Sequence, residues 1–465
     1  MSDIKFGTDG WRAIIAQDYT TQNVARITEA TAIWLKQQHP NPSIVVGHDC
    51  RFAGALFTDV VCKVMAKHHI KVFRANGIAS TPMVSLGTNR LGAQQGIVIT
   101  ASHNPPSYNG YKLKSAAGGP TPPAQITAVE NLIPETASIP ATSLEELAAQ
   151  GLLEWVDLEN MYYDEVQQKF DLSLMRNAGL RIAYDAMYGA GQQIFPRLFP
   201  EAYLLHCDYN PSFMGRAPEP LHKNLPELAA LVPEKGCHAG LANDGDADRI
   251  GMYDENGKFL DAHHIILLVI YYLCHYKKMN GKVVIAFSVT DRVKKLCTHF
   301  DLDYVVTKIG FKYICEYMVN EDVLLGGEES GGIAVKGHIP ERDGIWIGLL
   351  IFELMAKTGK SISQLIDEIY QITGRFVFER NDLHLQMDKK EAIVANCKNN
   401  VYTEFGSYKV ERLEDIDGYK YHLGNERWVM IRPSGTEPVL RIYAEAENEQ
   451  VVLDILAQTK QAILA

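Results

Sequence analysis

The chain lacks closely spaced cysteine pairs. Eight cysteines lie among 465 residues, at positions 50, 62, 207, 237, 274, 297, 315 and 397. This distribution lacks the CxxC pairs of structural zinc sites and the cysteine density of a secreted disulfide scaffold. We therefore expect reduced thiols and a cytoplasmic protein.

Long hydrophobic segments are also missing. The longest apolar run covers residues 265–274, which is too short to span a bilayer. The first residues include Asp3, Lys5 and Asp9 and contain no apolar stretch, so they do not resemble a secretory signal. We expect neither a membrane segment nor a secretory leader.

Positive charge is in deficit, because the formal net charge is -11. A broad nucleic-acid or anionic-membrane surface needs an excess of Lys and Arg, so we expect neither partner. A small anionic substrate is compatible with this composition if basic side chains gather locally.

Apolar residues, in contrast, are abundant. The chain is 46% hydrophobic and 22% charged, which is a globular composition, and its length suggests about three or four domains. Several β-branched runs end in Gly, Asp or Ser and precede helical periodicity, as in α/β units, and these runs are residues 43–47, 96–100, 180–184 and 282–286. Functional groups are expected where such strands end.

Changes in composition and in the pattern of expected strands and helices along the chain predict four domains. Three α/β domains are expected at residues 1–155, 156–260 and 261–374, and a smaller α+β domain at 375–465. The second domain closes with a strand, an acidic loop and two further strands between His238 and Leu260. In the last domain, strands at 427–431 and 439–443 flank a loop, and a closing helix begins near Glu449.

Ser102 offers a hydroxyl that can carry phosphate. It follows an expected buried strand, and Pro105 and Pro106 prevent a helix, so we expect a rigid, exposed loop. The hexapeptide TASHNP alone is also typical of an ordinary turn. If the chain doubles back, Lys112 comes within reach and can hydrogen-bond a substrate hydroxyl or shuttle its proton. The alternative for Lys112 is a solvated surface lysine.

Three carboxylates alternate along the loop DGDADR, at Asp244, Asp246 and Asp248. On an extended loop they can converge on one face, where they repel one another unless a cation lies between them. Hard oxygen ligands favour Mg²⁺, and Arg249 would then contact a phosphate beside the metal. The alternative is an acidic, solvated turn.

Two further loops carry polar groups suited to a phosphorylated polyol. In RPSGTEP, Arg432 precedes hydroxyls and backbone N–H groups that can form an anion nest for a non-reacting phosphate. In GGEESGG, Glu328 and Ser330 offer acceptors and a donor for hydroxyl groups. A plain hairpin loop and a solvated glycine-rich loop are the respective alternatives. The segment 338–344 shows no obvious chemistry of its own.

The order of five motifs carries a resemblance. FGTDGWR at 6–12 is followed by the Ser102, Asp244, Glu328 and Arg432 loops, from one end of the chain to the other. In this order and spacing the chain resembles the α-D-phosphohexomutase family, in its bacterial phosphoglucomutase/phosphomannomutase branch.

The resemblance implies four domains around a central cleft, three of them α/β domains with mixed sheets and the last one α+β. It implies a phosphoserine at Ser102, with Mg²⁺ held by its phosphate and by Asp244, Asp246 and Asp248. The other implied roles are proton-transfer assistance by Arg12 and Lys112, phosphate contact by Arg249, sugar-hydroxyl contacts by Glu328 and Ser330, and a phosphate clamp of Arg432, Ser434, Gly435 and Thr436.

The implied reaction moves a phosphoryl group reversibly between O1 and O6 of a hexose phosphate through a 1,6-bisphosphate, with glucose 1,6-bisphosphate as intermediate and activator. Ser330-Gly331-Gly332 departs from the Ser-Gly-His of many relatives, and with Glu328-Glu329 and Phe311 it favours glucose phosphate. Mannose and glucosamine phosphates are the alternatives within the same reaction class. A Mg²⁺-dependent sugar-phosphate phosphatase and a non-catalytic sugar-phosphate binding protein are further alternatives. We expect a monomer or homodimer.

Overall fold

The computed structural model describes residues 4–434 and 439–464. The chain divides into two compact units, one formed by residues 1–284 and 310–366 and the other by residues 285–309 and 367–465. Each unit is described by itself below. Among the described ranges, no helix combines the length and the hydropathy needed to cross a bilayer.

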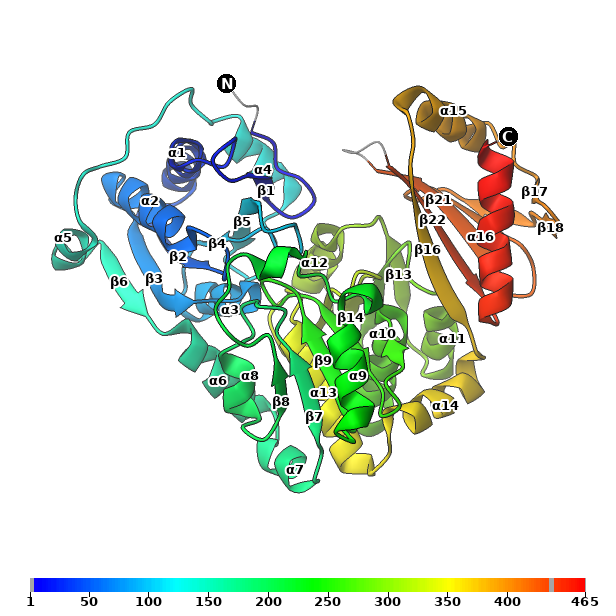
Figure 1. The fold of residues 1–465 in the computed structure, drawn as a ribbon. Helices are drawn as coiled ribbons and strands as arrows, with labels where there is room; N and C mark the ends of the chain where they lie inside the picture. The colour runs from blue at the N-terminus through cyan, green and yellow to red at the C-terminus, as the bar shows by residue number, and fades with distance from the viewer. Residues whose placement is uncertain (1–3, 435–438, 465) are drawn as a thin grey trace. The chain divides into compact units, whose positions relative to one another are not determined.

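The first sheet has six strands in the order β1-β5-β4-β2-β3-β6 (Figure 1). The strands of this sheet and the helices between them along the chain are β1 (Trp11–Ile14), α1 (Thr21–Gln38), β2 (Ser43–His48), α2 (Gly54–Lys67), β3 (Lys71–Ile78), α3 (Thr81–Arg90), β4 (Gln95–Ile99), β5 (Tyr108–Ser115), α4 (Pro123–Glu130), α5 (Leu144–Ala149) and β6 (Leu153–Val156). β2, β3, β4 and β6 run parallel, whereas β5 is antiparallel to both β1 and β4. The sheet is therefore mixed.

One connection departs from the expected strand-then-helix pattern. After β4 the chain returns directly as β5, since Pro105 and Pro106 prevent a helix and an extended run follows. The antiparallel register places Lys112 opposite Val98, so the polar end of β4 and the side chains of β5 belong to one region.

The second sheet has five strands in the order β11-β10-β9-β7-β8. Its elements are α6 (Leu158–Lys169), α7 (Leu172–Asn177), β7 (Ile182–Asp185), α8 (Ile194–Leu198), β8 (Tyr203–Leu205), α9 (Pro226–Glu234), β9 (Ala239–Asn243), β10 (Ile250–Tyr253) and β11 (Phe259–Leu260). The predicted strand, acidic loop and two further strands are confirmed as β9, the 244–249 loop, β10 and β11.

The next stretch contains α10 (Ala262–Tyr271), η3 (Tyr272–Tyr276), β12 (Lys282–Ala286), α11 (Arg292–His299), β13 (Tyr304–Thr307), α12 (Phe311–Asn320), β14 (Val323–Gly327), β15 (Ile333–Val335), α13 (Gly344–Thr358) and α14 (Ile362–Thr373). The boundary between the two units passes through β12. β14 and β15 form an antiparallel pair, and the glycine-rich loop with Glu328 joins them.

The second unit contains a sheet of order β16-β22-β21-β20-β19, in which all neighbours are antiparallel. Its elements are β16 (Val377–His384), α15 (Met387–Lys398), β17 (Glu404–Phe405), β18 (Tyr408–Lys409), β19 (Arg412–Glu414), β20 (Tyr419–His422), β21 (Trp428–Pro433), β22 (Val439–Ala446) and α16 (Glu449–Leu464). α16 lies beside β21 and β22 (Figure 1), and buried residues of these three elements belong to one core. The predicted closing helix and its flanking strands are confirmed.

Candidate active site

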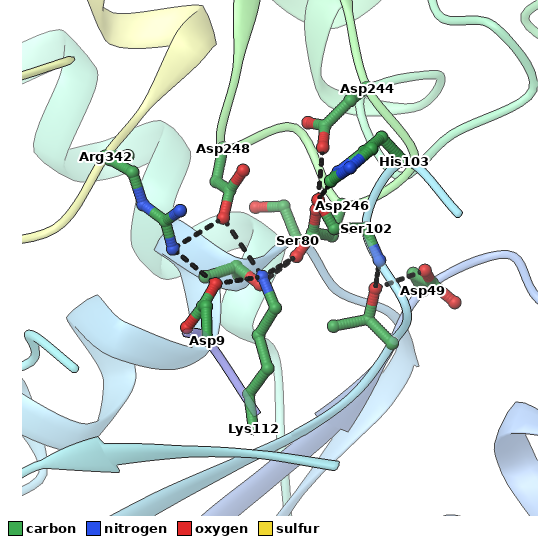
Figure 2. Close-up of polar contacts among 12 residues, drawn as sticks. Asp9, Asp49, Ser80, Ser102, His103, Lys112, Asp244, Asp246, Asp248 and Arg342 are labelled. Atoms are coloured by element: carbon green, nitrogen blue, oxygen red, sulfur yellow. Dashed lines mark hydrogen bonds and ion pairs between the residues drawn. The ribbon is translucent and has the colours of Figure 1, made fainter. Parts of the chain in front are cut away.

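Ser102 lies in the turn between β4 and β5, and its side chain faces the acidic loop (Figure 2). Its Oγ donates a hydrogen bond of 2.6 Å to Asp244 Oδ2. The residue is 1% exposed, whereas Pro105 and Ser107 of the same loop are exposed, so the prediction of an exposed loop is wrong at Ser102 itself. The reason is that the acidic loop, 142 positions later in the sequence, covers the serine loop. The main chain at Gly245 approaches so closely that a Cβ there would lie 2.5 Å from the main-chain oxygen of Ser102.

The serine loop is held in an uncommon backbone conformation. Ser102 has a φ of 51°, in the left-handed region that non-glycine residues avoid. Thr100 Oγ1 accepts from the Ser102 N–H at 2.9 Å and donates to Asp49 Oδ2 at 2.6 Å. Burial raises the Asp49 pKa to about 6, although Arg51 and these hydrogen bonds oppose the rise. The loop is therefore positioned by buried polar groups that follow β2.

The three aspartates converge as predicted. One oxygen from each of Asp244, Asp246 and Asp248 lies within 4.8 Å of the others, and all three side chains are buried. Burial and repulsion from Asp246 and Asp248 raise the Asp244 pKa well above its usual value. Within the described parts of the chain, Asp246 Oδ1 and Asp248 Oδ1 are buried and have no hydrogen-bond partner. Clustered carboxylates with unsatisfied oxygens are the ligands that a hard divalent cation favours.

Lys112 projects from β5 into this cluster (Figure 2). Its Nζ lies 2.7 Å from Asp246 Oδ2, 3.0 Å from Asp248 Oδ2 and 2.8 Å from Asp9 Oδ2. Burial alone would lower the Lys112 pKa, but these carboxylates raise it, so the ammonium keeps its proton. The expectation that the chain doubles back is confirmed, and the solvated alternative for Lys112 is wrong because the side chain is 1% exposed.

Other basic groups border the same region. Arg12 in β1 donates from Nη1 to Asn104 Oδ1 in the serine loop at 2.7 Å. The Arg249 N–H donates to Asp244 Oδ1 at 3.0 Å, and its side chain lies 3.7 Å from Glu219. Burial, together with the charges of Arg249, Arg12, Lys112 and Arg51, lowers the pKa of His103 well below its usual value. These positive charges can offset the negative charge of an anionic group bound beside Ser102.

Glu328 follows β14 and is buried, and its Oε1 accepts from the Gly310 N–H at 3.0 Å. Burial raises its pKa to about 7, and Glu329 adds to the rise while Arg342 and Arg249 oppose it. Ser330 lies in the turn that follows, half-buried. Both residues belong to the same unit as Ser102.

The residues of the predicted phosphate clamp belong to the second unit. Arg432 is the next-to-last residue of β21 and donates from Nη2 to Asp417 Oδ2 at 3.2 Å. The Ser434 N–H donates to the Val439 oxygen at 2.9 Å, and Lys390 Nζ donates to the Ser434 oxygen at 2.6 Å. Gly435 and Thr436 lie outside the described residues.

Sequence reasoning missed several residues of the site. Asp9 and Arg342 lie in motifs in which they were given no role, and Asp49 and Arg51 were not considered. Thr81, which donates from Oγ1 to Asp246 Oδ2 at 2.5 Å, was also missed. A usable signal existed for Asp49 and Arg51, because both follow the carboxyl end of the parallel strand β2.

Comparison with known families assigns the class. Profiles described as phosphoglucomutase/phosphomannomutase alpha/beta/alpha domains I, II and III match residues 3–139, 160–257 and 261–372, and the profile of the C-terminal domain matches residues 384–462. These matches confirm the four-domain fold class and define the protein as a phosphohexomutase. The chain belongs to the phosphoglucomutase/phosphomannomutase family.

Individual relatives agree with this assignment. A phosphoglucomutase/phosphomannomutase of Thermococcus kodakarensis is 30% identical over 97% of this chain and 96% of its own length. A phosphoglucosamine mutase of Carboxydothermus hydrogenoformans is 29% identical over 97% of this chain and 98% of its own. The crystal structure of a candidate phosphomannomutase from Thermus thermophilus superposes with a TM-score of 0.87 at 30% identity, covering 100% of both chains.

Proposed function

We propose that the protein moves a phosphoryl group reversibly between O1 and O6 of a hexose phosphate, with Ser102 as the residue that carries phosphate. The observation that supports this most is the 2.6 Å hydrogen bond between Ser102 Oγ and Asp244 Oδ2. It joins a buried hydroxyl to carboxylates that have two unsatisfied oxygens. A phosphoryl group on Ser102 would lie between these carboxylates and the basic groups of Arg12 and Arg249.

The reaction proposed has two transfers that balance. In the first, the bond between phosphorus and Ser102 Oγ breaks and Oγ takes up a proton, while the free sugar hydroxyl forms a bond to the phosphorus and gives up its proton. In the second, the 1,6-bisphosphate, turned end for end, returns its other phosphoryl group to Ser102 Oγ, which gives up its proton, and the released sugar oxygen takes up a proton. No water is consumed and no inorganic phosphate is released.

Arg12 and Lys112 are the residues that we propose assist these proton movements. Lys112 is held as a cation by three carboxylates, which match its three N–H donors, so a hydrogen bond to a substrate oxygen would replace one of these contacts. Glu328 and Ser330 are proposed to contact sugar hydroxyls, and Arg432, Ser434, Gly435 and Thr436 to hold the non-reacting phosphate. A clamp that grips either phosphate would make both orientations of the bisphosphate productive.

Asp244, Asp246 and Asp248, with the phosphate of Ser102, are proposed to hold Mg²⁺. Bound there, Mg²⁺ would neutralise charge that develops on the transferred phosphoryl group. The unsatisfied oxygens of Asp246 and Asp248 support this choice, since the donor set consists of carboxylates. Glucose 1,6-bisphosphate, or the bisphosphate of the sugar used, is proposed as intermediate and activator.

The preferred sugar is a separate question from the type of reaction. The sequence around Ser330-Gly331-Gly332 favours glucose, but relatives of similar identity carry the names phosphoglucosamine mutase and phosphoglucomutase/phosphomannomutase. The name of the Carboxydothermus hydrogenoformans relative supports glucosamine phosphate, the name of the Thermus thermophilus structure supports mannose phosphate, and the combined name of the Thermococcus kodakarensis relative does not separate mannose from glucose. We therefore propose that glucosamine or mannose phosphate is turned over faster than glucose phosphate.

Phosphorus NMR tests both parts of the proposal. Glucosamine 1-phosphate, mannose 1-phosphate and glucose 1-phosphate are each incubated with the protein, Mg²⁺ and a trace of the matching 1,6-bisphosphate. A 6-phosphate signal without inorganic phosphate is expected, and the relative rates rank the sugars. Release of inorganic phosphate would instead indicate a phosphatase, and no change in any sample would indicate a binding protein.

A further inference from the structure

Arg342 lies in the charged cluster beside the three aspartates, although its sequence context shows no obvious chemistry. Its side chain is buried at 4% exposure. Nη2 lies 2.5 Å from Asp9 Oδ2 and 3.0 Å from Asp248 Oδ2, so one guanidinium joins two carboxylates that Lys112 also contacts (Figure 2). The guanidinium carbon also lies 5.2 Å from the centroid of the Phe311 ring.

Gly332 provides the space that the Arg342 side chain occupies. A Cβ at position 332 would lie 2.5 Å from Arg342 Cδ and 3.1 Å from its Cγ, closer than side-chain atoms approach one another. The guanidinium is anchored at its far end by Asp9 and Asp248, so the middle of the side chain cannot move away without weakening those ion pairs. A residue larger than glycine at position 332 is therefore incompatible with the observed Arg342.

The segment that carries Arg342 is itself fixed by buried contacts. Asp343 caps α13 by accepting from the Trp346 N–H at 3.0 Å, and its carboxylate also accepts from the Tyr162 hydroxyl at 2.8 Å. The His338 ring stacks on Trp346 with centroids 3.7 Å apart, and its Nε2 lies 2.9 Å from Asp343 Oδ2. These contacts set the direction from which Arg342 enters the cluster.

We propose that Arg342 is a positioning residue for the metal carboxylates, and that Gly332 is its matched partner. This inference rests on the proposed function, because it assigns Asp248 to a metal. Arg342 and Lys112 share Asp248 Oδ2 at 3.0 Å each, and this fixes the carboxylate while Oδ1 stays free of hydrogen bonds among the described residues. Partners of this kind orient the groups that bind metal directly, and their loss commonly lowers metal affinity about 10- to 100-fold.

The test is a double-mutant cycle read out by Mn²⁺ binding. Arg342→Ala, Gly332→Ala and the double variant are titrated with Mn²⁺ as full-length proteins, and free Mn²⁺ is followed by electron paramagnetic resonance. We expect each single variant to bind Mn²⁺ about 10- to 100-fold more weakly than the wild type. The double variant is expected to bind about as weakly as Arg342→Ala alone, because the clash at Gly332 disappears when the arginine is shortened.

Matched controls separate this effect from general damage. Gly77→Ala adds a Cβ where no atom lies within 4 Å, and Arg375→Ala removes an arginine side chain that is 69% exposed, so both should bind Mn²⁺ like the wild type. Arg342→Lys keeps the charge but cannot present two donors in a planar fork, so its affinity should be intermediate. If Arg342→Ala does not fold, the affinities of Arg342→Lys and Gly332→Ala decide the question.

Two results would overturn the inference. One is wild-type Mn²⁺ affinity in Gly332→Ala or in the arginine variants, and the other is a double variant whose loss equals the product of the two single losses. The readout needs no sugar phosphate. A protein that failed to convert any hexose phosphate would therefore still decide this question, and the two proposals can fail separately.

Discussion

Arg51 Nη2 donates a hydrogen bond of 2.7 Å to the main-chain oxygen of Ser102. The same guanidinium reaches the main-chain oxygens of Asn104, Pro105 and Tyr108 at 2.6–2.9 Å. It is buried at 1% exposure and paired with Asp49 at 3.4 Å. One side chain thus satisfies four carbonyl groups of the loop that presents the serine hydroxyl, which explains how a left-handed conformation at Ser102 is maintained.

Arg51→Lys should loosen the serine loop. An ammonium cannot reproduce the planar fork of donors, so several carbonyls and Asp49 would lose partners. We expect the unfolding free energy to fall by about 3 kcal/mol and kcat by about a hundredfold. Chemical denaturation and steady-state kinetics measure the two effects. Arg74→Lys, at another buried arginine paired with Asp59, should lower stability but keep kcat. An Arg51→Lys variant with wild-type kcat would contradict the role assigned to Arg51.

A divalent cation should stabilise the unit that contains the three aspartates. Binding to the native state at a concentration a hundred times the Kd adds about 2.7 kcal/mol to the unfolding free energy. We expect Mg²⁺ to raise Tm in scanning calorimetry, and the rise to disappear in Asp246→Asn. Chelation should also stop turnover, and added Mg²⁺ should restore it. A Mg²⁺-dependent rise in Tm that is preserved in Asp246→Asn would place the metal elsewhere.

Arg432→Ala should weaken substrate binding more than the chemical step. A hydrogen bond to a charged group contributes about 1.5–3 kcal/mol, so KM should rise about tenfold to a hundredfold while kcat changes less. Steady-state kinetics on the preferred sugar phosphate measure both constants. Arg412→Ala, at an arginine of the same unit that is 57% exposed, is the matched control. An unchanged KM in Arg432→Ala would count against the phosphate clamp.

Glu445 in β22 gives the second unit a pH-dependent stability. Burial raises its pKa to about 7, and Asp291 adds to this, whereas Thr290, Arg292 and Lys420 oppose it. The native state therefore keeps a proton that the unfolded chain releases near pH 4.5. The stabilisation is complete below that pH and is lost as the pH rises through about 7, at most by about 1.4 kcal/mol per pH unit.

Calorimetry between pH 5 and 8 tests this prediction. The wild type should lose stability over this range relative to Glu445→Gln, since glutamine cannot titrate. The difference in unfolding free energy between the two proteins should change by about 3 kcal/mol in total. If the unfolding free energies of the two proteins changed with pH in parallel, Glu445 would titrate normally and the prediction would be contradicted.

The strands and the chemistry-bearing loops were predictable because their signals are local. The runs at 43–47 and 282–286 are β-branched and buried, and they appear as β2 and β12. The alternating aspartates of the 244–248 loop converge as predicted, but on a turn and not on the extended loop that the prediction assumed, because the Ala247 N–H donates to the Asp244 main-chain oxygen at 3.1 Å and Ala247 has a φ of 58°. Each of these inferences used fewer than about ten adjacent residues.

The partners of the site were not predictable because they come from distant parts of the chain. Asp9 and Arg342 are 333 positions apart, and no local pattern indicates that they form an ion pair. The burial of Ser102 depends in the same way on the close approach of Gly245, which local reasoning about Pro105 and Pro106 could not include. Tertiary contacts of this kind determine burial and pKa, so the electrostatics of the site required the structure.

The central claim is that Ser102 carries the phosphoryl group, and intact-protein mass spectrometry tests it directly. Wild-type protein, Ser102→Ala and a control variant at the exposed Ser107, Ser107→Ala, are incubated with the matching hexose 1,6-bisphosphate and Mg²⁺. The account predicts the added mass of one phosphoryl group on the wild type and on Ser107→Ala, with none on a folded but inactive Ser102→Ala. A phosphorylated or fully active Ser102→Ala protein would contradict it.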